Sequence, residues 1–167
     1  ISSLCKKNSI PLFFFDKNNP NLLSKILKNK TPDLVFCLGW PRLLKQEVLD
    51  IPRLGVIGYH PAKLPLNRGR HPLIWTLALG LKESASTFFL MDKGADSGDI
   101  ISQEIFSIED SDYAKDIYKK ITDIGMDQLE EIYYKYEKGT INPIPQEHQN
   151  SSYWRKRSPS LDGVIDW

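Results

Sequence analysis

The stretch DLVFCLGWPRLLKQEVLDIPRLGVIGYH, residues 33–60, decides the fold of this chain. It begins and ends with short, uninterrupted apolar runs, at 33–38 and 54–59, each the length of a buried strand. Between them, Pro41 can open a helix. The apolar face of that helix would consist of Leu43, Leu44, Val48 and Leu49. Two strands joined through a helix pair in parallel, and strands without polar alternation suit a sheet covered on both faces.

The same reasoning extends the fold in both directions along the chain. Strands are expected at 10–15, 33–38, 54–59, 85–92 and 99–107. Helices are expected within 1–9, after Pro20, after Pro41, at 71–81 and at 110–138. We therefore predict one α/β domain, a three-layer sandwich with a mostly parallel, Rossmann-like sheet. It spans residues 1–167, and the largely irregular segment 140–167 closes it.

The composition is that of an ordinary globular domain. Hydrophobic residues make up 41% and charged residues 26% of the 167 positions. Twenty-two basic and 21 acidic residues leave a net charge of +1, which predicts neither a nucleic-acid nor a membrane surface. No apolar run approaches the roughly 20 residues of a membrane span. Cys5 and Cys37 lack metal-ligand spacing, so no metal site is expected and their thiols suit a reducing cytoplasm.

Side chains capable of chemistry are densest between His60 and Asp99. His60 directly follows a buried strand, at the end where ligand sites of open α/β sheets lie. Asp92, Asp96 and Asp99 share one glycine-containing connection between two strands. Residue type alone leaves a structural role open for each of them, because turn aspartates commonly bond their own backbone.

Three separated motifs resemble those of one enzyme family. Residues 52–69, PRLGVIGYHPAKLPLNRG, are similar to a strand followed by Asn-x-His-Pro-x-x-Leu-Pro and a basic-Gly pair. Residues 86–103, STFFLMDKGADSGDIISQ, are similar to a threonine-bearing strand, an Asp-[Ser/Thr/Gly]-Gly loop and a further strand. Residues 152–167, SYWRKRSPSLDGVIDW, are similar to the segment that ends the same domain. In order and spacing, the chain resembles the catalytic domain of the folate-dependent N-formyltransferases, which implies the formyltransferase fold.

The resemblance implies a donor and an acid/base pair. The family uses formyl-tetrahydrofolate and surrounds the formyl carbon with an Asn, a His and an Asp; the last two correspond to His60 and Asp96. Protonated His60 would stabilise the oxyanion that forms when an amine attacks the formyl carbonyl, and Asp96 would orient His60 and help move the amine proton. Neither a covalent enzyme intermediate nor a metal is implied.

One position departs from the family pattern. Gly58 stands where the family asparagine would be, two residues before His60, and glycine has no side-chain donor. Asn67 lies in the following loop and is the nearest residue that could supply an amide. A role for Asn67 in shaping the turn before Arg68 remains the alternative.

The resemblance also implies a folate pocket and an acceptor site. One wall of the pocket would be the segment after the second expected strand: Gly39, Trp40, Pro41, Arg42, Leu43 and Leu44. A second wall would come from the loop that carries Met91, Asp92 and Gly94. Acceptor contacts are expected from Arg68, Gly69 and Arg70. Trp40 would serve as an aromatic wall for the planar pterin ring.

The expected acceptor is a small primary amine, with an amino-sugar nucleotide favoured by exclusion. Relatives that formylate methionyl-tRNA usually carry a further domain beyond Trp167 and a basic surface for RNA. Alternatives remain open: a methionyl-tRNA formyltransferase-like enzyme, a hydrolase of formyl-tetrahydrofolate, or a folate-binding or assembly module without catalysis. A homodimer is compatible with this interpretation.

The resemblance starts partway into the family's domain. Its first strand, glycine-containing loop, first helix and second strand have no counterpart before Ile1. The strand at 33–38 would then lack its expected neighbour on one side, which leaves an apolar edge open to pairing. A shortened chain, a pseudogene-like product or a chain that needs a partner is therefore expected.

Overall fold

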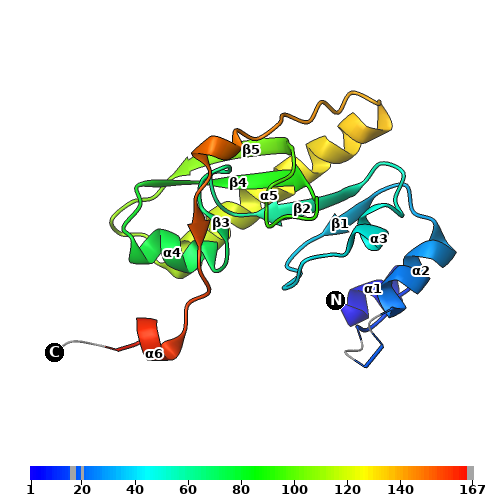
Figure 1. The fold of residues 1–167 in the computed structure, drawn as a ribbon, viewed down its shortest axis with the longest axis horizontal. Helices are drawn as coiled ribbons and strands as arrows, with labels where there is room; N and C mark the ends of the chain where they lie inside the picture. Colours follow the sequence, from blue (N-terminus) through cyan, green and yellow to red (C-terminus); the bar gives the residue numbers. More distant parts are fainter. Residues whose placement is uncertain (16–17, 20, 165–167) are drawn as a thin grey trace.

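A computed structural model describes residues 1–15, 18–19 and 21–164. The elements follow in the order α1 (Ser2–Lys7), α2 (Leu22–Lys30), β1 (Val35–Cys37), α3 (Gln46–Leu49), β2 (Val56–His60), β3 (Arg68–Gly69), α4 (Pro72–Ala78), β4 (Glu83–Leu90), β5 (Ile100–Ser107), α5 (Ala114–Glu137), η1 (His148–Asn150), β6 (Tyr153–Trp154) and α6 (Pro159–Asp162). Figure 1 shows them as a mixed sheet with helices packed against it.

The main sheet has the strand order β1-β2-β4-β5 (Figure 1). β1 and β2 are parallel, as predicted from the helix between them, whereas β2–β4 and β4–β5 are antiparallel. Residues 91–99 connect β4 to β5, which is too short for the dozen or more residues of a parallel crossover. The α/β class is confirmed, but in these four strands the expected predominance of parallel pairing is wrong.

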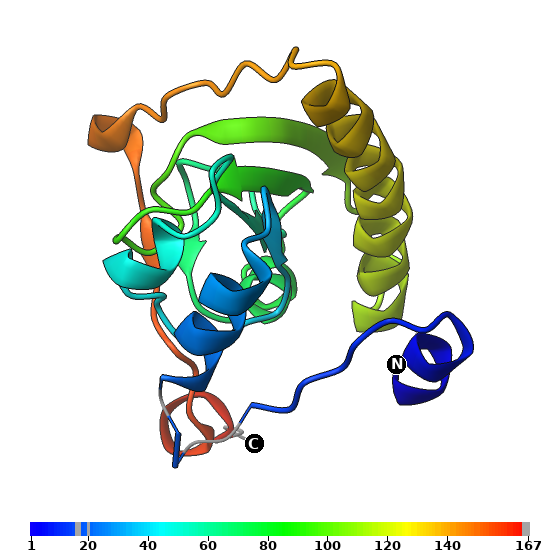
Figure 2. The same cartoon turned by 90° about the vertical axis from the view of Figure 1, so that its right-hand side faces the viewer.

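Helices cover both faces of this sheet, so the predicted three layers are present. On one face, α2 and α3 pack on β1 and β2 around Leu44, Val48, Leu49 and Val56. On the other face, Ile132 of α5 packs on Ile57 and Phe88. Figure 2 shows α5 along one side of the sheet and α2 and α3 on the opposite side. The neighbours Val56 and Ile57 enter different cores because successive strand side chains point to opposite faces.

The helix α4 joins the α5 side of the molecule through a third apolar cluster. Its residues Leu73 and Leu77, with Leu81 beyond its end, pack on Ile117 and Ile121 of α5. The cluster holds α4 near the end of the loop that follows His60, and so it places one rim of the candidate site.

Two predicted elements differ from the structure. Residues 10–15 are exposed and belong to no strand, because no described segment supplies them with ladder hydrogen bonds. Phe15 instead packs edge-on against Trp40, with ring centroids 5.2 Å apart. The helix expected from Pro41 begins only at Gln46, because Lys45 is extended, with ψ at 151°, and residues 41–45 form a loop.

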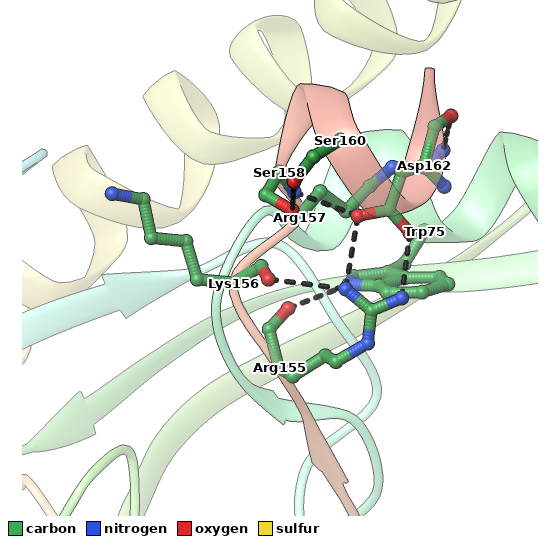
Figure 3. Close-up of polar contacts among 7 residues, drawn as sticks. All are labelled: Trp75, Arg155, Lys156, Arg157, Ser158, Ser160 and Asp162. Carbon is green, nitrogen blue, oxygen red and sulfur yellow. Dashed lines mark hydrogen bonds and ion pairs between the residues drawn. The ribbon is translucent and has the colours of Figure 1, made fainter. Parts of the chain in front are cut away.

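The segment beyond α5 returns across the domain and pairs β6 with β3 in parallel. Its end is anchored on Trp75 of α4, whose Nε1 donates to the Arg155 carbonyl at 2.9 Å. The guanidinium groups of Arg155 and Arg157 lie 5.2 and 4.8 Å from the centre of the same ring (Figure 3). Asp162 accepts two hydrogen bonds from Arg155, at 2.9 and 2.6 Å, and one from the Ser158 amide at 2.6 Å.

None of the helices in the described residues is long and apolar enough to cross a membrane.

This anchor predicts a release of α6 at acid pH. The hydrogen bonds from Arg155, with that from the Ser158 amide, lower the pKa of Asp162 from 3.8 to about 2. Because the folded pKa is depressed, the stabilisation is present above about pH 4 and is lost as the pH falls through about 2. Hydrogen exchange of the Ser158 amide should therefore accelerate over this window beyond its intrinsic pH dependence. The Asp162→Asn variant should show the released behaviour already at pH 7; equal protection at pH 5 and pH 2 would contradict the assignment.

Candidate active site

Folding brings His60 and Asp96 together at one cavity. His60 is the last residue of β2 and is only 4% exposed, and Asp96 lies in the 91–99 loop. His60 Nδ1 is 3.6 Å from Asp96 Oδ2. Both residues line the cavity, so the predicted pair shares one site.

The protonation of the His60 ring follows from its second contact. Nε2 lies 2.8 Å from the carbonyl oxygen of Asn67. A carbonyl can only accept, so Nε2 carries the hydrogen in either charge state of the ring. Nδ1 is therefore the atom whose proton can come and go, and it is the one beside Asp96.

Asp96 is held in place by a backbone donor and by its own conformation. Its Oδ2 accepts from the Gly69 amide at 2.8 Å, and its φ of 53° is in the left-handed region. The carboxylate is thus fixed against both β3 and the imidazole. At 3.6 Å, Nδ1 and Oδ2 lie at ion-pair distance and not in a direct hydrogen bond, so each group keeps its own capacity for acid/base chemistry at the cavity.

Asn67 contributes its main chain, and the prediction of a side-chain role for it is corrected. Its carbonyl orients His60, whereas its Oδ1 lies 3.4 Å from the Ser152 hydroxyl, and Asn67 does not line the cavity. Its φ of 64° is in the left-handed region, which asparagine adopts in turns more readily than most residues. Asn67 therefore shapes the turn, the alternative left open above.

The cavity has a volume of about 550 Å³. Most of the predicted pocket residues line it: Gly39, Trp40, Pro41, Arg42, Leu43, Met91, Gly94, Gly69 and Arg70. Leu44 does not, because it is buried in the core under α3. Asp92 does not either, because its Oδ1 accepts from the Gly94 amide and the Ser97 hydroxyl, at 2.9 and 2.7 Å, and so shapes the loop. Arg68 is buried beneath the site at 2% exposure, which corrects the expectation that it contacts an acceptor.

The space beside Gly58 is already filled. A Cβ atom built on Gly58 would lie 2.7 Å from Cζ of Phe89 and 2.9 Å from Cγ of Met91. The family asparagine therefore has no room here while these two side chains keep their positions. The rings and chains of Phe89 and Met91 thus occupy the position that a side chain on residue 58 would enter first.

This packing predicts coupled stability effects. Gly58→Asn should lower the free energy of unfolding by about 1 to 3 kcal/mol, because the new side chain overpacks a buried strand. Phe89→Val in the same chain should recover part of that loss, because the smaller side chain leaves room for the new one. Residues in contact have coupled effects on stability. Urea unfolding of both single variants and the double variant measures the coupling. Additive effects would show that Phe89 does not occupy the asparagine position.

Several residues of the site gave no signal in the sequence. Gln146 donates to the carbonyls of Asp96 and Gly98, at 3.0 and 2.6 Å, and comes from the segment expected to be irregular. His71 stands at the N-cap position of α4, without a side-chain capping hydrogen bond, and lines the cavity. Within the described residues, His71 Nδ1 and Trp40 Nε1 are buried without a hydrogen-bond partner.

Other chemistries find little support in the same cavity. Burial raises the pKa of the Cys37 thiol, which lines the wall, so it stays protonated and is a poor nucleophile. No group of three or more His, Cys, Asp or Glu side chains that could hold a metal ion occurs in the described part of the chain.

Comparison with known proteins agrees with this geometry. The profile of the formyl transferase family matches residues 4–132. The methionyl-tRNA formyltransferase of Caldanaerobacter subterraneus is 33% identical over 151 residues, covering 90% of this chain and 48% of that protein. The bifunctional polymyxin resistance protein ArnA of Wigglesworthia glossinidia brevipalpis is 38% identical over 166 residues, covering 96% of this chain and 24% of that protein. The chain thus spans half or less of the length of these curated relatives.

A solved structure supports the fold independently. The sugar 3N-formyl transferase WlaRD, crystallised in the presence of dTDP and 5-N-formyl-THF, superposes with a TM-score of 0.75 at 22% identity. The match covers 92% of this chain and 52% of that one. The predicted formyltransferase fold is confirmed, and the chain belongs to the formyl transferase family.

Proposed function

We propose that this chain forms the transfer site of an enzyme that moves a formyl group from formyl-tetrahydrofolate to a primary amine. The observation that carries the proposal is the His60–Asp96 pair, with Nδ1 3.6 Å from Oδ2 on the wall of a cavity. Asn67 holds Nε2 and Gly69 holds Oδ2, so the facing Nδ1 and Oδ2 atoms have fixed positions. Membership of the formyl transferase family supports the reaction class.

The pair suits both proton demands of formyl transfer. With the proton on Nδ1, His60 donates toward the formyl oxygen as the amine adds to the carbon and that oxygen becomes negative. Asp96 receives the proton that the new C–N bond makes acidic. That proton passes to the folate nitrogen as its bond to the formyl carbon breaks, so charge and protons balance. Cys37 takes no part, because no covalent intermediate is needed.

The cavity fits a donor of this kind. Its volume of about 550 Å³ lies within the roughly 300 to 1,000 Å³ typical of small-molecule sites. Trp40, Phe89 and Met91 offer apolar wall for a planar ring. The proposed folate contacts are therefore Gly39–Leu43 on one wall and the 91–96 loop on the other.

For the acceptor, we propose an amino-sugar nucleotide. The support is the fold shared with a sugar 3N-formyl transferase crystallised with dTDP, together with Arg42 and Arg70 at the cavity. Guanidinium groups pair well with phosphate oxygens. Arg70 uses one nitrogen on the Pro41 carbonyl, at 2.7 Å, and its fork keeps further donors for a ligand.

A panel of acceptors tests the proposal. Formyl-tetrahydrofolate turnover would be measured in the full protein with amino-sugar nucleotides, methionyl-tRNA, glycinamide ribonucleotide and water alone. We expect the highest kcat/KM with an amino-sugar nucleotide. Preference for either other amine would overturn the acceptor but keep the reaction, and turnover equal with and without amine would indicate a hydrolase.

One observation favours a second candidate, folate binding without transfer. Phe89 fills the space of the family amide beside Gly58, so an expected transition-state donor is absent. Calorimetry with tetrahydrofolate, run beside the turnover assay, separates the two functions. Tight binding with no turnover on any amine would support the binding module.

A further inference from the structure

Arg68 is a fully buried cation whose partners in the described chain are all neutral. It is 2% exposed, and no described carboxylate lies within 4.0 Å of it. Nε and Nη2 both donate to Oε1 of Gln146, at 3.1 and 2.6 Å. Nη1 donates to the Tyr153 hydroxyl at 3.0 Å, and Nη2 to Nδ1 of His148 at 3.2 Å. Burying a charge without a carboxylate partner is costly. A complete set of neutral acceptors around such a charge therefore suggests that Arg68 has a function.

Gln146 connects this cation to the catalytic loop. Its Oε1 accepts the hydrogen bonds from Nε and Nη2 of Arg68. Its Nε2 donates to the carbonyls of Asp96 and Gly98, at 3.0 and 2.6 Å. Gln146 is itself buried, at 5% exposure. Every hydrogen-bonding group of its side chain is therefore used, and the amide can adopt only one orientation.

The neighbours of Arg68 hold the two members of the acid/base pair directly. The Asn67 carbonyl accepts from His60, and the Gly69 amide donates to the Asp96 carboxylate. β3 is secured in turn by β6, through Arg68 N to the Ser152 carbonyl at 2.9 Å and Arg70 N to the Trp154 carbonyl at 3.1 Å. Each of the three residues 67–69 thus holds one part of the site. The first orients His60, the second supports the backbone of Asp96 through Gln146, and the third holds the Asp96 carboxylate.

We propose that Arg68 and Gln146 are positioning residues that set the distance and orientation of Asp96 relative to His60. The proposal rests on the proposed function of that pair. Since Asp96 has a left-handed φ of 53°, its backbone needs external support, and Gln146 supplies it at the carbonyl. Neither residue touches the cavity, so both act through Asp96.

Gln146→Glu separates positioning from packing. The new carboxylate keeps the volume and pairs with Arg68, but it cannot donate to the carbonyls of Asp96 and Gly98. We expect kcat to fall by about tenfold or more while the KM for both substrates changes less than threefold, with an altered pH–rate profile. Tyr153→Phe is the matched control, because it removes one hydrogen bond from Nη1 and leaves the fork to Gln146 intact. Its kcat should stay within threefold, with the parent's pH profile.

A second variant and a second readout keep the test decisive. Arg68→Lys keeps the charge but loses the fork, so it should show the same kcat and pH signature if Gln146→Glu fails to fold. The NMR shifts of the His60 ring should change in both variants and not in Tyr153→Phe. This readout needs no turnover, so it distinguishes failure of the positioning role of Arg68 and Gln146 from failure of the proposed function. Parent-like ring shifts, or parent-like kcat and pH profile, in both folded variants would overturn the proposal.

Discussion

His60→Ala is expected to lower formyl-tetrahydrofolate turnover by about 10²- to 10⁴-fold, the range lost with a positioned acid/base group. The residue is the one imidazole whose Nδ1 faces a carboxylate in the cavity, at 3.6 Å from Asp96. Asp96→Asn should have a comparable effect, because an amide neither accepts the amine proton nor carries the charge that balances protonated His60. Turnover is measured in the full protein at saturating donor and acceptor.

The double variant tests whether the two residues act together. If they act as a unit, His60→Ala with Asp96→Asn should cost little beyond the worse single change, because coupled residues are not additive. Tetrahydrofolate affinity by calorimetry should change far less than turnover, since the proposed folate walls lie elsewhere. Asp123→Asn, which removes an exposed carboxylate paired with Lys119 on α5, controls for the loss of a charge. Turnover of His60→Ala within tenfold of the parent would contradict the proposed mechanism.

Gly98→Ala is expected to destabilise the fold by about 3 kcal/mol or more, at the upper end of overpacking costs. A Cβ atom on Gly98 would lie 1.7 Å from the carbonyl oxygen of Leu90 and 2.9 Å from its carbon. These are backbone atoms at the end of β4, so they cannot rotate away as a side chain would. The displaced loop would also pull the Gly98 carbonyl from Gln146, and Asp96 with it.

Gly125→Ala is the matched control for that change. Its new Cβ would lie no closer than 3.5 Å to another atom, the Tyr59 hydroxyl, and it replaces a glycine inside α5. It should stabilise the protein by about 0.5 to 1 kcal/mol, the helix propensity difference. Urea unfolding gives both values. A Gly98→Ala protein within about 0.5 kcal/mol of the parent would show that the loop adapts at little cost.

Elements with a strong local pattern were predictable from the sequence, and those that depend on a distant partner were not. The apolar stripe of α5 and the apolar runs of β1 and β2 predicted the type of each element, and its bounds to within a few residues. The apolar run at 10–15 looks similar but forms no strand, because strand formation needs hydrogen bonds from another segment. The antiparallel pairing of β4 follows from a connection whose path the sequence pattern does not describe.

The candidate site divides in the same way. The local patterns of the sequence determined the α/β class, and the resemblance of its motifs to the formyltransferases pointed to His60 and Asp96 as the acid/base candidates. Only the tertiary structure decided that Asn67 offers its carbonyl, that Arg68 points into the protein and that Gln146, 50 positions from Asp96, holds its backbone. The reason is physical: local pattern reports which groups a residue carries, whereas left-handed turns and hydrogen bonds between distant segments decide where those groups point.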